Sequence, residues 1–231
     1  MKRPFLATAG VLCFAGLALA ACGPDGKPPK PSNNHWNDKA MTVKSRLDCP
    51  EKQGVLTRVS AAADGKSCVY TGDDAEITLR QIAIGPDGAR AALAPIESEL
   101  RALVPYKAKP PEKTGEHTEI RLPGLHITAQ DDSSGGSAQV RVAGVHINAD
   151  DNGAEIRAEN FGENSVKASL ILAGDKIPTS DHPVVGYEAR GPVKGPLIVA
   201  VVKSKGKDYH NDGNGAFMDM KRLVKRNTNE D

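Results

Sequence analysis

Aromatic residues and net charge are both low in this sequence. The chain has 231 residues, of which four are Phe, four Tyr and one Trp, and its formal net charge is +1. Base stacking and sugar stacking need aromatic faces, and an electrostatic nucleic-acid surface needs an excess of Lys and Arg. No nucleic-acid partner is therefore expected, and the core must come mostly from Val, Ile, Leu and Ala.

Long apolar runs are also lacking, except for one at the start of the chain. Lys2 and Arg3 precede an apolar stretch, Pro4 to Ala21, that is barely long enough to cross a bilayer. A basic start, a short apolar run and small residues behind it are typical of a secretory signal peptide. The stretch therefore predicts export, with residues 1–21 removed from the mature chain.

Cys22 directly follows this stretch, behind Leu19-Ala20-Ala21. Leu-Ala-Ala-Cys resembles the lipobox of bacterial lipoproteins. The resemblance implies that the Cys22 thiol is acylated and that Cys22 becomes the first residue of a membrane-anchored chain. It also implies a bacterial cell envelope location. Gly23 is not the aspartate associated with inner-membrane retention, which favours the outer membrane, with the protein facing the periplasm or exposed at the surface. The alternative is a chance cysteine behind a plain signal peptide.

Residues 22–41 are rich in Pro, Lys, Asn and Gly and predict a flexible spacer behind the anchor. Of the four cysteines, Cys13 leaves with the signal and Cys22 is consumed by lipid. Cys49 and Cys68 remain, and in an oxidising compartment such a pair predicts a disulfide. Two free thiols or half of a metal site are the alternatives.

Two folded units are expected, which either fold separately or share one core. The first, 42–106, is predicted as a small disulfide-pinned β unit with one helix, and 107–116 is a polar linker. Its strands are expected at 55–59, 68–70 and 76–82, with a hairpin turn at Asp64-Gly65. Its helix is expected from apolar residues at helical spacing, Leu93, Ile96, Leu100 and Leu103, with Pro95 in the first turn.

The second unit, 117–231, is predicted as a β-rich repeat domain with a C-terminal helix. Residues 119–129 are matched by 139–149, an offset of 20 residues, and a truncated third copy starts at Ala154. Alternating polar and apolar residues predict strands, and Gly124 and Gly144 predict a bulge or tight bend between the halves of each copy. Such copies form hairpins of a sandwich or rungs of a stacked sheet.

The pattern of strand, glycine, strand and turn in 119–158 resembles the repetitive β domains of bacterial surface adhesins and envelope-stress proteins. The resemblance carries no functional residue to this chain. Further strands are expected at 166–173 and 197–202, with loops and edges at 174–196. A helix is expected over 217–224 behind a cap at Asn214. The fold class is thus mainly β, a β-rich α+β fold with antiparallel repeat-containing sheets, one mid-chain helix and one C-terminal helix.

The histidines of the two repeats, His126 and His146, are the candidate metal ligands. Strands stacked in register would place both imidazoles on one sheet face, and the paired aspartates of the adjoining turns would add oxygen ligands. These aspartates are Asp131, Asp132, Asp150 and Asp151. The alternative is two histidines on a solvated face beside ordinary acidic turns.

No residue pattern in the mature chain points to catalysis. The Gly-x-Ser-x-Gly motif is absent, and residues 211–215 do not follow the first strand of a βαβ unit as a nucleotide loop does. No catalytic residue and no cofactor are therefore expected. Three functions follow: a non-enzymatic envelope component that binds another protein or a surface polymer through its sheet edges, a metal or small-ligand binder, or a hydrolase or transferase without a recognisable motif.

Overall fold

The computed structural model of the chain describes residues 39–108, 116–122, 125–132, 135–174, 181–206 and 215–230. The elements in these ranges are, in chain order, β1 (Met41–Val43), β2 (Lys52–Gln53), β3 (Leu56–Ala61), β4 (Ser67–Gly72), β5 (Ala75–Ile82), α1 (Gly88–Leu103), β6 (Glu116–Leu122), β7 (Leu125–Asp132), β8 (Gly135–Val142), β9 (Val145–Asp150), β10 (Gly153–Phe161), β11 (Ser165–Ala173), β12 (Val184–Pro192), β13 (Leu197–Ser204), α2 (Ala216–Arg226) and β14 (Thr228–Glu230). Cys22 and the predicted signal and spacer lie outside the described residues, apart from the last few residues of the spacer.

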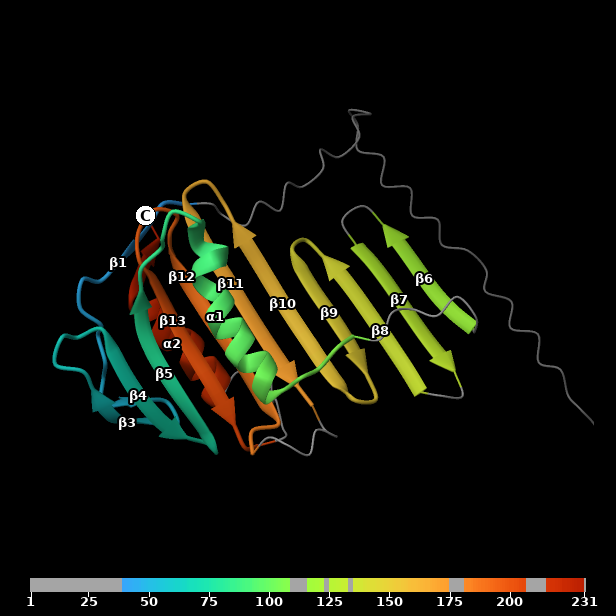
Figure 1. Ribbon diagram of the computed structural model, residues 1–231, viewed down its shortest axis with the longest axis horizontal. Coiled ribbons are helices and arrows are strands. Elements are labelled where there is room, and N and C mark those ends of the chain that lie inside the picture. The colour runs from blue at the N-terminus through green and yellow to red at the C-terminus, as the bar shows by residue number, and fades with distance from the viewer. Residues whose placement is uncertain are drawn as a thin grey trace, which may run out of the picture. The chain divides into compact units, whose positions relative to one another are not determined.

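Twelve of these strands form one antiparallel sheet, in the order β2-β3-β4-β5-β13-β12-β11-β10-β9-β8-β7-β6 (Figure 1). The strands β1 and β14 form a separate two-stranded sheet. The predicted β-rich α+β class is confirmed, with one helix in mid-chain and one near the C-terminus. Because β5 pairs with β13 from Ala75 to Ile82, the segments before and after the predicted linker belong to one sheet and share one core.

The central strands are covered on both faces, and β13 shows how the sequence achieves this. Its side chains alternate between two buried clusters: Leu197, Val199 and Val201 belong to one, and Ile198, Ala200 and Val202 to the other. A strand buried on both faces has no polar alternation, which explains its continuous apolar run. Helix α1 belongs to the first cluster and α2 to the second, so the two helices lie on opposite faces of the sheet.

Helix α1 packs Leu93, Ile96 and Leu100 against β11 and β12. It begins at Gly88, earlier than the proline had suggested, and Pro95 lies in its interior rather than in its first turn. A proline inside a helix removes one backbone hydrogen bond and normally breaks the helix. Here Pro95 is on the exposed side, so water can reach the freed carbonyl, while Ala89 and Leu93 hold the preceding turn on the sheet.

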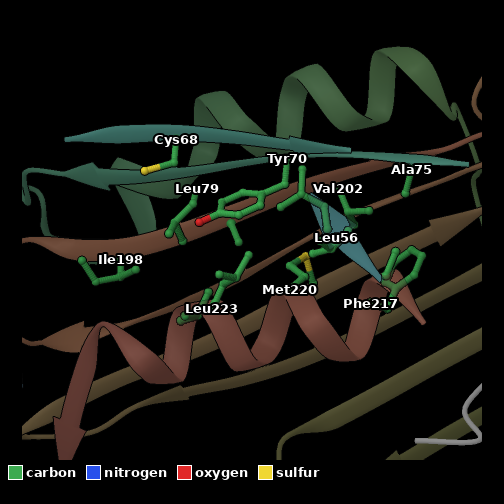
Figure 2. Close-up of a cluster of buried hydrophobic side chains, with 14 of the residues drawn as sticks. Leu56, Cys68, Tyr70, Ala75, Leu79, Ile198, Val202, Phe217, Met220 and Leu223 are labelled. Atoms are coloured by element: carbon green, nitrogen blue, oxygen red, sulfur yellow. The ribbon is translucent and has the colours of Figure 1, made fainter. Parts of the chain in front are cut away.

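Helix α2 packs against the other face of β5 and β13, where Met220 and Leu223 meet Tyr70 and Leu79 (Figure 2). All four side chains are fully buried. The apolar spacing that predicted this helix is therefore the spacing of its sheet-facing side. The predicted cap, Asn214, lies outside the described residues, and Gly215 occupies the N-cap position.

A buried carboxylate on α2 fixes the β2–β3 turn. The Asp219 side chain accepts a hydrogen bond from the Val55 backbone N–H at 2.9 Å and another from Arg222 at 2.8 Å. Gly54, with φ +58°, approaches so closely that a Cβ on it would lie 1.9 Å from an Asp219 oxygen. Only glycine combines that backbone conformation with that space.

We expect Asp219→Ala to lower the free energy of unfolding by about 2 kcal/mol, because the Val55 backbone N–H and Arg222 lose the buried carboxylate that accepts their hydrogen bonds. Urea unfolding followed by circular dichroism measures the change. Lys225→Ala is the matched control on an exposed position of the same helix and should change stability by less than about 0.5 kcal/mol. Equal stability of the two variants would show that water replaces the Asp219 contact.

The predicted disulfide between Cys49 and Cys68 is confirmed. Cys68 lies on β4 at the end of the hairpin that turns at Gly65, whose φ is +70°. Cys49 packs against the same apolar cluster as Cys68. The bond therefore ties the segment before β2 to the core. It links two cysteines that are 19 residues apart in the sequence.

One strand was missed in the sequence. Residues 174–196 were expected to hold loops and edges, yet β12 occupies Val184–Pro192 between β11 and β13. The many Gly and Pro residues of this stretch had suggested loops, and two of the glycines, Gly186 and Gly191, lie in β12. In the sheet they serve close packing, since a Cβ on Gly186 would lie 2.4 Å from the Leu170 carbonyl oxygen and one on Gly191 would lie 2.6 Å from that of Pro196.

The sequence repeat forms the other end of the sheet. The first copy is the β6–β7 hairpin, the second is the β8–β9 hairpin, and the third begins β10. In the second copy Ala143 and Gly144 both have positive φ, 42° and 84°, as a two-residue hairpin turn requires. The tight bend predicted at Gly144 is thus present, and Gly124 lies outside the described residues. Figure 1 shows no helix over β6–β9 among the described elements.

Candidate functional site

The extension, which we define as β6–β9, has two chemically different faces. Strand register aligns Arg121, His126, Arg141, His146 and Arg157 side by side from β6 to β10. We call this line the Arg–His row. It lies on the α1 face of the sheet, because Arg157 contacts α1 directly. Residues directly opposite on antiparallel strands share a face, so the sequence repeat becomes a row of similar side chains in space.

The two repeat histidines share this face, as the repeat implies, but a strand separates them. His126 is on β7 and His146 on β9, and Arg141 of β8 lies between them. Two strand spacings amount to roughly 10 Å, and an arginine cation occupies the middle. Among the described residues there is no group of three His, Cys, Asp or Glu side chains placed to hold a metal ion. The geometry therefore gives a shared metal little support.

The outer end of the row is an ion-pair cluster on the sheet surface. One oxygen of Glu119 lies 2.8 Å from His126 Nε2 and accepts a hydrogen bond from Arg121 Nε at 2.7 Å. These two hydrogen bonds, His126 first, lower the pKa of the Glu119 carboxyl. The cluster is exposed, so it orients side chains more than it stabilises the fold.

The middle of the row is open. Arg141 and His146 are exposed, and the described residues provide neither with a hydrogen-bond or ion-pair partner. A shallow hollow of about 520 Å³ is lined by Arg121, His126, Arg141 and His146 together with apolar residues of the adjoining turn. A guanidinium with free donors beside imidazoles is suited to an anionic group.

The inner end of the row is a network on β10, the strand next to the extension, that joins this strand to α1. Arg157 donates to both oxygens of Glu97 on α1, at 3.1 and 2.7 Å, and Tyr187 donates to the same carboxylate at 2.7 Å. Arg157 also donates to Glu155 and Glu159 on its own strand. We call these five residues the junction.

Two further arginines of α1 complete this contact. Arg101 makes a bidentate pair with Glu155, at 3.1 and 2.8 Å, and Arg90 contacts Glu159 at 2.9 Å and lies over the Phe161 ring. Burial raises the pKa of Glu97, but the hydrogen bonds from Arg157 and Tyr187 outweigh burial, and the pKa falls below its ordinary value. Burial and the Glu97 charge raise the pKa of Tyr187. Together with Arg90 and Arg101, Arg157 balances the three glutamates, so the junction is a structural contact.

The junction was not recognised in the sequence. Glu155, Arg157 and Glu159 alternate along one strand face, and this pattern is visible as Glu-Ile-Arg-Ala-Glu. Their partners lie far away in the chain: Glu97 is 60 residues from Arg157 and 90 from Tyr187. A local pattern predicts that a strand carries charges on one side, but it does not identify what those charges meet.

Of the predicted acidic turn residues, Asp150 has a structural role. Asp150 accepts hydrogen bonds from the Asn152 backbone N–H at 2.8 Å and from the Tyr106 hydroxyl at 3.3 Å. Burial, followed by the Asp150 charge, raises the pKa of Tyr106 to about 12. Asp151 lies in the exposed turn, and the side chains of Asp131 and Asp132 lie outside the description.

The opposite face of the extension is apolar. Register aligns Ile120, Ile127, Val140, Ile147 and Ile156 into a second line, the isoleucine row. Its inner end, Ile156, packs against the buried α2 cluster. At its outer end Ile120 is 43% exposed, and on the same face Val142 is 38% exposed. An apolar row that continues from the core through half-buried residues to an exposed end is typical of an interaction surface.

Among the described residues there is no helix long and apolar enough to span a membrane. Comparisons with protein-family models, with curated proteins and with solved structures find no match to this chain. The functional assignment therefore depends on the two faces and the edge of the extension.

Proposed function

We propose that this chain is a non-enzymatic lipid-anchored protein of the bacterial cell envelope with an interaction role. Cys22 carries the lipid, and residues 22–41 hold the folded domain away from the outer membrane. The observation that carries the proposal is the extension, whose isoleucine row leaves the core and reaches an exposed end at Ile120. Catalytic proteins concentrate perturbed titratable groups in a cleft, whereas Glu97, Arg157 and Tyr187 of the junction, whose pKa values are shifted, are hydrogen-bonded to one another.

The partner of this surface is another envelope protein or a surface polymer. A sheet with an uncovered apolar face and an open edge binds extended chains by strand addition and binds apolar side chains on its face. The lipid anchor confines the domain to one membrane, which raises its effective concentration toward partners at the same membrane. A modest contact area is then sufficient for association.

A photo-cross-linking residue placed at Val142 tests this proposal in intact cells. We expect a discrete cross-linked product in the membrane fraction, because Val142 lies on the exposed apolar face. The matched control is the same residue at Val59, which is 63% exposed on β3 at the other end of the sheet and should give no such product. Cys22→Ala should remove both membrane association and the product.

Two results would contradict the proposal separately. Membrane association that survives Cys22→Ala would overturn the lipid anchor and the location inferred from it. Identical cross-linking from Val142 and Val59, or none from either position in an anchored protein, would overturn the extension as the interaction surface.

A second candidate function is binding of a small anionic ligand at the middle of the Arg–His row, favoured by the exposed Arg141 guanidinium in its hollow. With inorganic phosphate as the probe, we expect Arg141→Ala to weaken binding about tenfold, since a charge-assisted hydrogen bond contributes at least about 1.5 kcal/mol. Isothermal titration calorimetry measures the affinity, and Lys52→Ala, at the opposite end of the sheet, is the control.

Thermal stabilisation by Zn²⁺ distinguishes the metal alternative from the anion alternative. The double variant His126→Ala, His146→Ala should leave thermal stabilisation by Zn²⁺ unchanged, because Arg141 separates the two imidazoles. If the wild type is stabilised by Zn²⁺ and the double variant is not, the two histidines bind the metal. That result would support the metal site and contradict the anion site.

A further inference from the structure

The two edges of the twelve-stranded sheet are different. At one edge β2 has only two residues, and β3 beside it is irregular between Arg58 and Ser60. Short strands and bulges are common protections against edge-to-edge pairing. At the other edge β6 has seven residues in uninterrupted register with β7, from Glu116 to Leu122. Within the described part of the chain, β7 is the only strand that pairs with β6.

The exposed middle of β6 is complementary to itself. Glu119, Ile120 and Arg121 are all exposed, with opposite charges on either side of an isoleucine. Antiparallel pairing about a twofold axis at Ile120 places Glu119 opposite the partner's Arg121, and Arg121 opposite the partner's Glu119. Opposite charges at directly facing positions stabilise antiparallel strands, and like charges destabilise them.

Neighbouring registers lack this complementarity. An axis at Glu119 brings two glutamates together, and an axis at Arg121 brings two arginines together. A shift by a single residue would place the polar face of one copy beside the apolar face of the other, since side chains alternate along a strand. Of the registers centred on these three residues, only the one centred on Ile120 pairs opposite charges and keeps both faces continuous.

The contacts of Glu119 within its own chain leave room for this pairing. Arg121 and His126 both contact the same oxygen, Oε1. A carboxylate accepts several hydrogen bonds through its two oxygens, so Oε2 can receive the partner's Arg121 without losing the contacts of the free chain. On the opposite face, the two isoleucine rows would meet at Ile120 and remove both exposed ends from water.

We propose that two copies of this chain pair along β6, with Ile120 at the twofold axis, so that one antiparallel sheet runs through the dimer. This proposal rests on the proposed function, since it names the occupant of the extension's open edge. Pairing of two lipid-anchored copies at one membrane requires little intrinsic affinity, because anchoring supplies a high effective concentration.

Charge reversal tests the pairing and its register in the full chain. Two differently tagged copies are produced together with their own signal sequence, cross-linked chemically in intact cells while both are anchored, extracted from membranes in mild detergent, and co-purified through one tag. For Glu119→Arg in both copies, or Arg121→Glu in both, we expect recovery of the second tag to fall at least about tenfold, because both facing pairs become like-charged.

The mixed pair identifies the register. One copy with Glu119→Arg and the other with Arg121→Glu again place opposite charges face to face, so recovery should return to the wild-type level. A loss of charge contacts within each chain cannot explain that rescue, because both copies still carry their single substitution. Glu51→Arg, a charge reversal near the opposite edge of the sheet, should leave recovery unchanged and serves as the control.

Failure of rescue in the mixed pair, or equal recovery from all variants, would overturn pairing along β6 in this register. The cross-linking experiment keeps this outcome distinct from failure of the proposed function. A Val142 product with a different protein, together with no co-purification of tagged copies, would leave the interaction surface standing and remove self-pairing. If neither a Val142 product nor co-purification is observed, both the interaction surface and self-pairing are overturned.

Discussion

Arg157→Met should lower the free energy of unfolding by about 3 kcal/mol. Arg157 is the cation at the centre of the junction, and its loss leaves the Glu97, Glu155 and Glu159 carboxylates close together with less compensation. Breaking a buried ion pair by removing one partner costs about 3–5 kcal/mol. We take the lower end, since the Arg157 and Glu97 side chains are 20% and 21% exposed. Methionine keeps the apolar stem, so the change tests charge more than volume.

Urea unfolding at neutral pH measures this loss. The control is Arg90→Ala, which removes a cation of the same network whose side chain is 69% exposed and should cost less than about 1 kcal/mol. Arg157 and Arg90 variants of equal stability would mean that water already screens the junction. Adding Glu97→Gln to Arg157→Met should recover part of the loss, because one unpaired carboxylate is removed.

The pH dependence follows from the lowered pKa of Glu97. A carboxyl whose pKa is lower in the folded than in the unfolded state stabilises the fold above its unfolded pKa, about 4.3 for glutamate. That stabilisation is lost as the pH falls through the folded pKa. The wild type should therefore lose stability below about pH 4 more steeply than Arg157→Met, and the gap between the two should narrow.

Leu223→Ala should destabilise the protein by about 3–4 kcal/mol. Leu223 is fully buried between α2 and the sheet, beside Tyr70 and Leu79 (Figure 2). Truncation removes apolar contacts and leaves a cavity that the surrounding strands fill only partly, and such leucine substitutions cost about 2.7–5 kcal/mol. The free energy of unfolding from urea titration measures the effect.

The control for this substitution is Val59→Ala on β3. Val59 is an apolar residue of the same sheet, but it is 63% exposed and should change stability by less than about 0.5 kcal/mol. A cost for Leu223→Ala below about 1 kcal/mol would indicate that α2 is loosely docked. The helix would then shift toward the sheet to fill the cavity.

Sequence patterns predicted the elements whose cause is local. Apolar runs predicted the strands at 166–173 and 197–202, now β11 and β13, and helical spacing predicted the sheet-facing side of α2. The Asp64-Gly65 pair predicted the β3–β4 turn. The cysteine count predicted the Cys49–Cys68 bond. The strands, the helix and the turn each depend on residues within one short segment. The disulfide depends on the small number of cysteines, which leaves few possible pairs.

What the sequence did not reveal depends on residues far apart in the chain. Glycines in β12 suggested a loop, because their purpose is close contact with neighbouring strands that the local pattern does not contain. The pairing of β5 with β13 joins residues more than 100 positions apart. For the candidate site, the repeat predicted that His126 and His146 share a face. The intervening Arg141 and the junction partners became visible only with the strand order.

The repeat makes the reach of the sheet adjustable in steps. Each 20-residue copy adds one hairpin, two strands at about 4.8 Å each, and so moves the free edge by roughly 10 Å. The covered core around β11–β13 does not take part in that change. Duplication or loss of a single copy would therefore alter how far the edge extends while conserving the body, and the same Arg and His would reappear at each new position. The width of the sheet can therefore change in steps of one 20-residue hairpin.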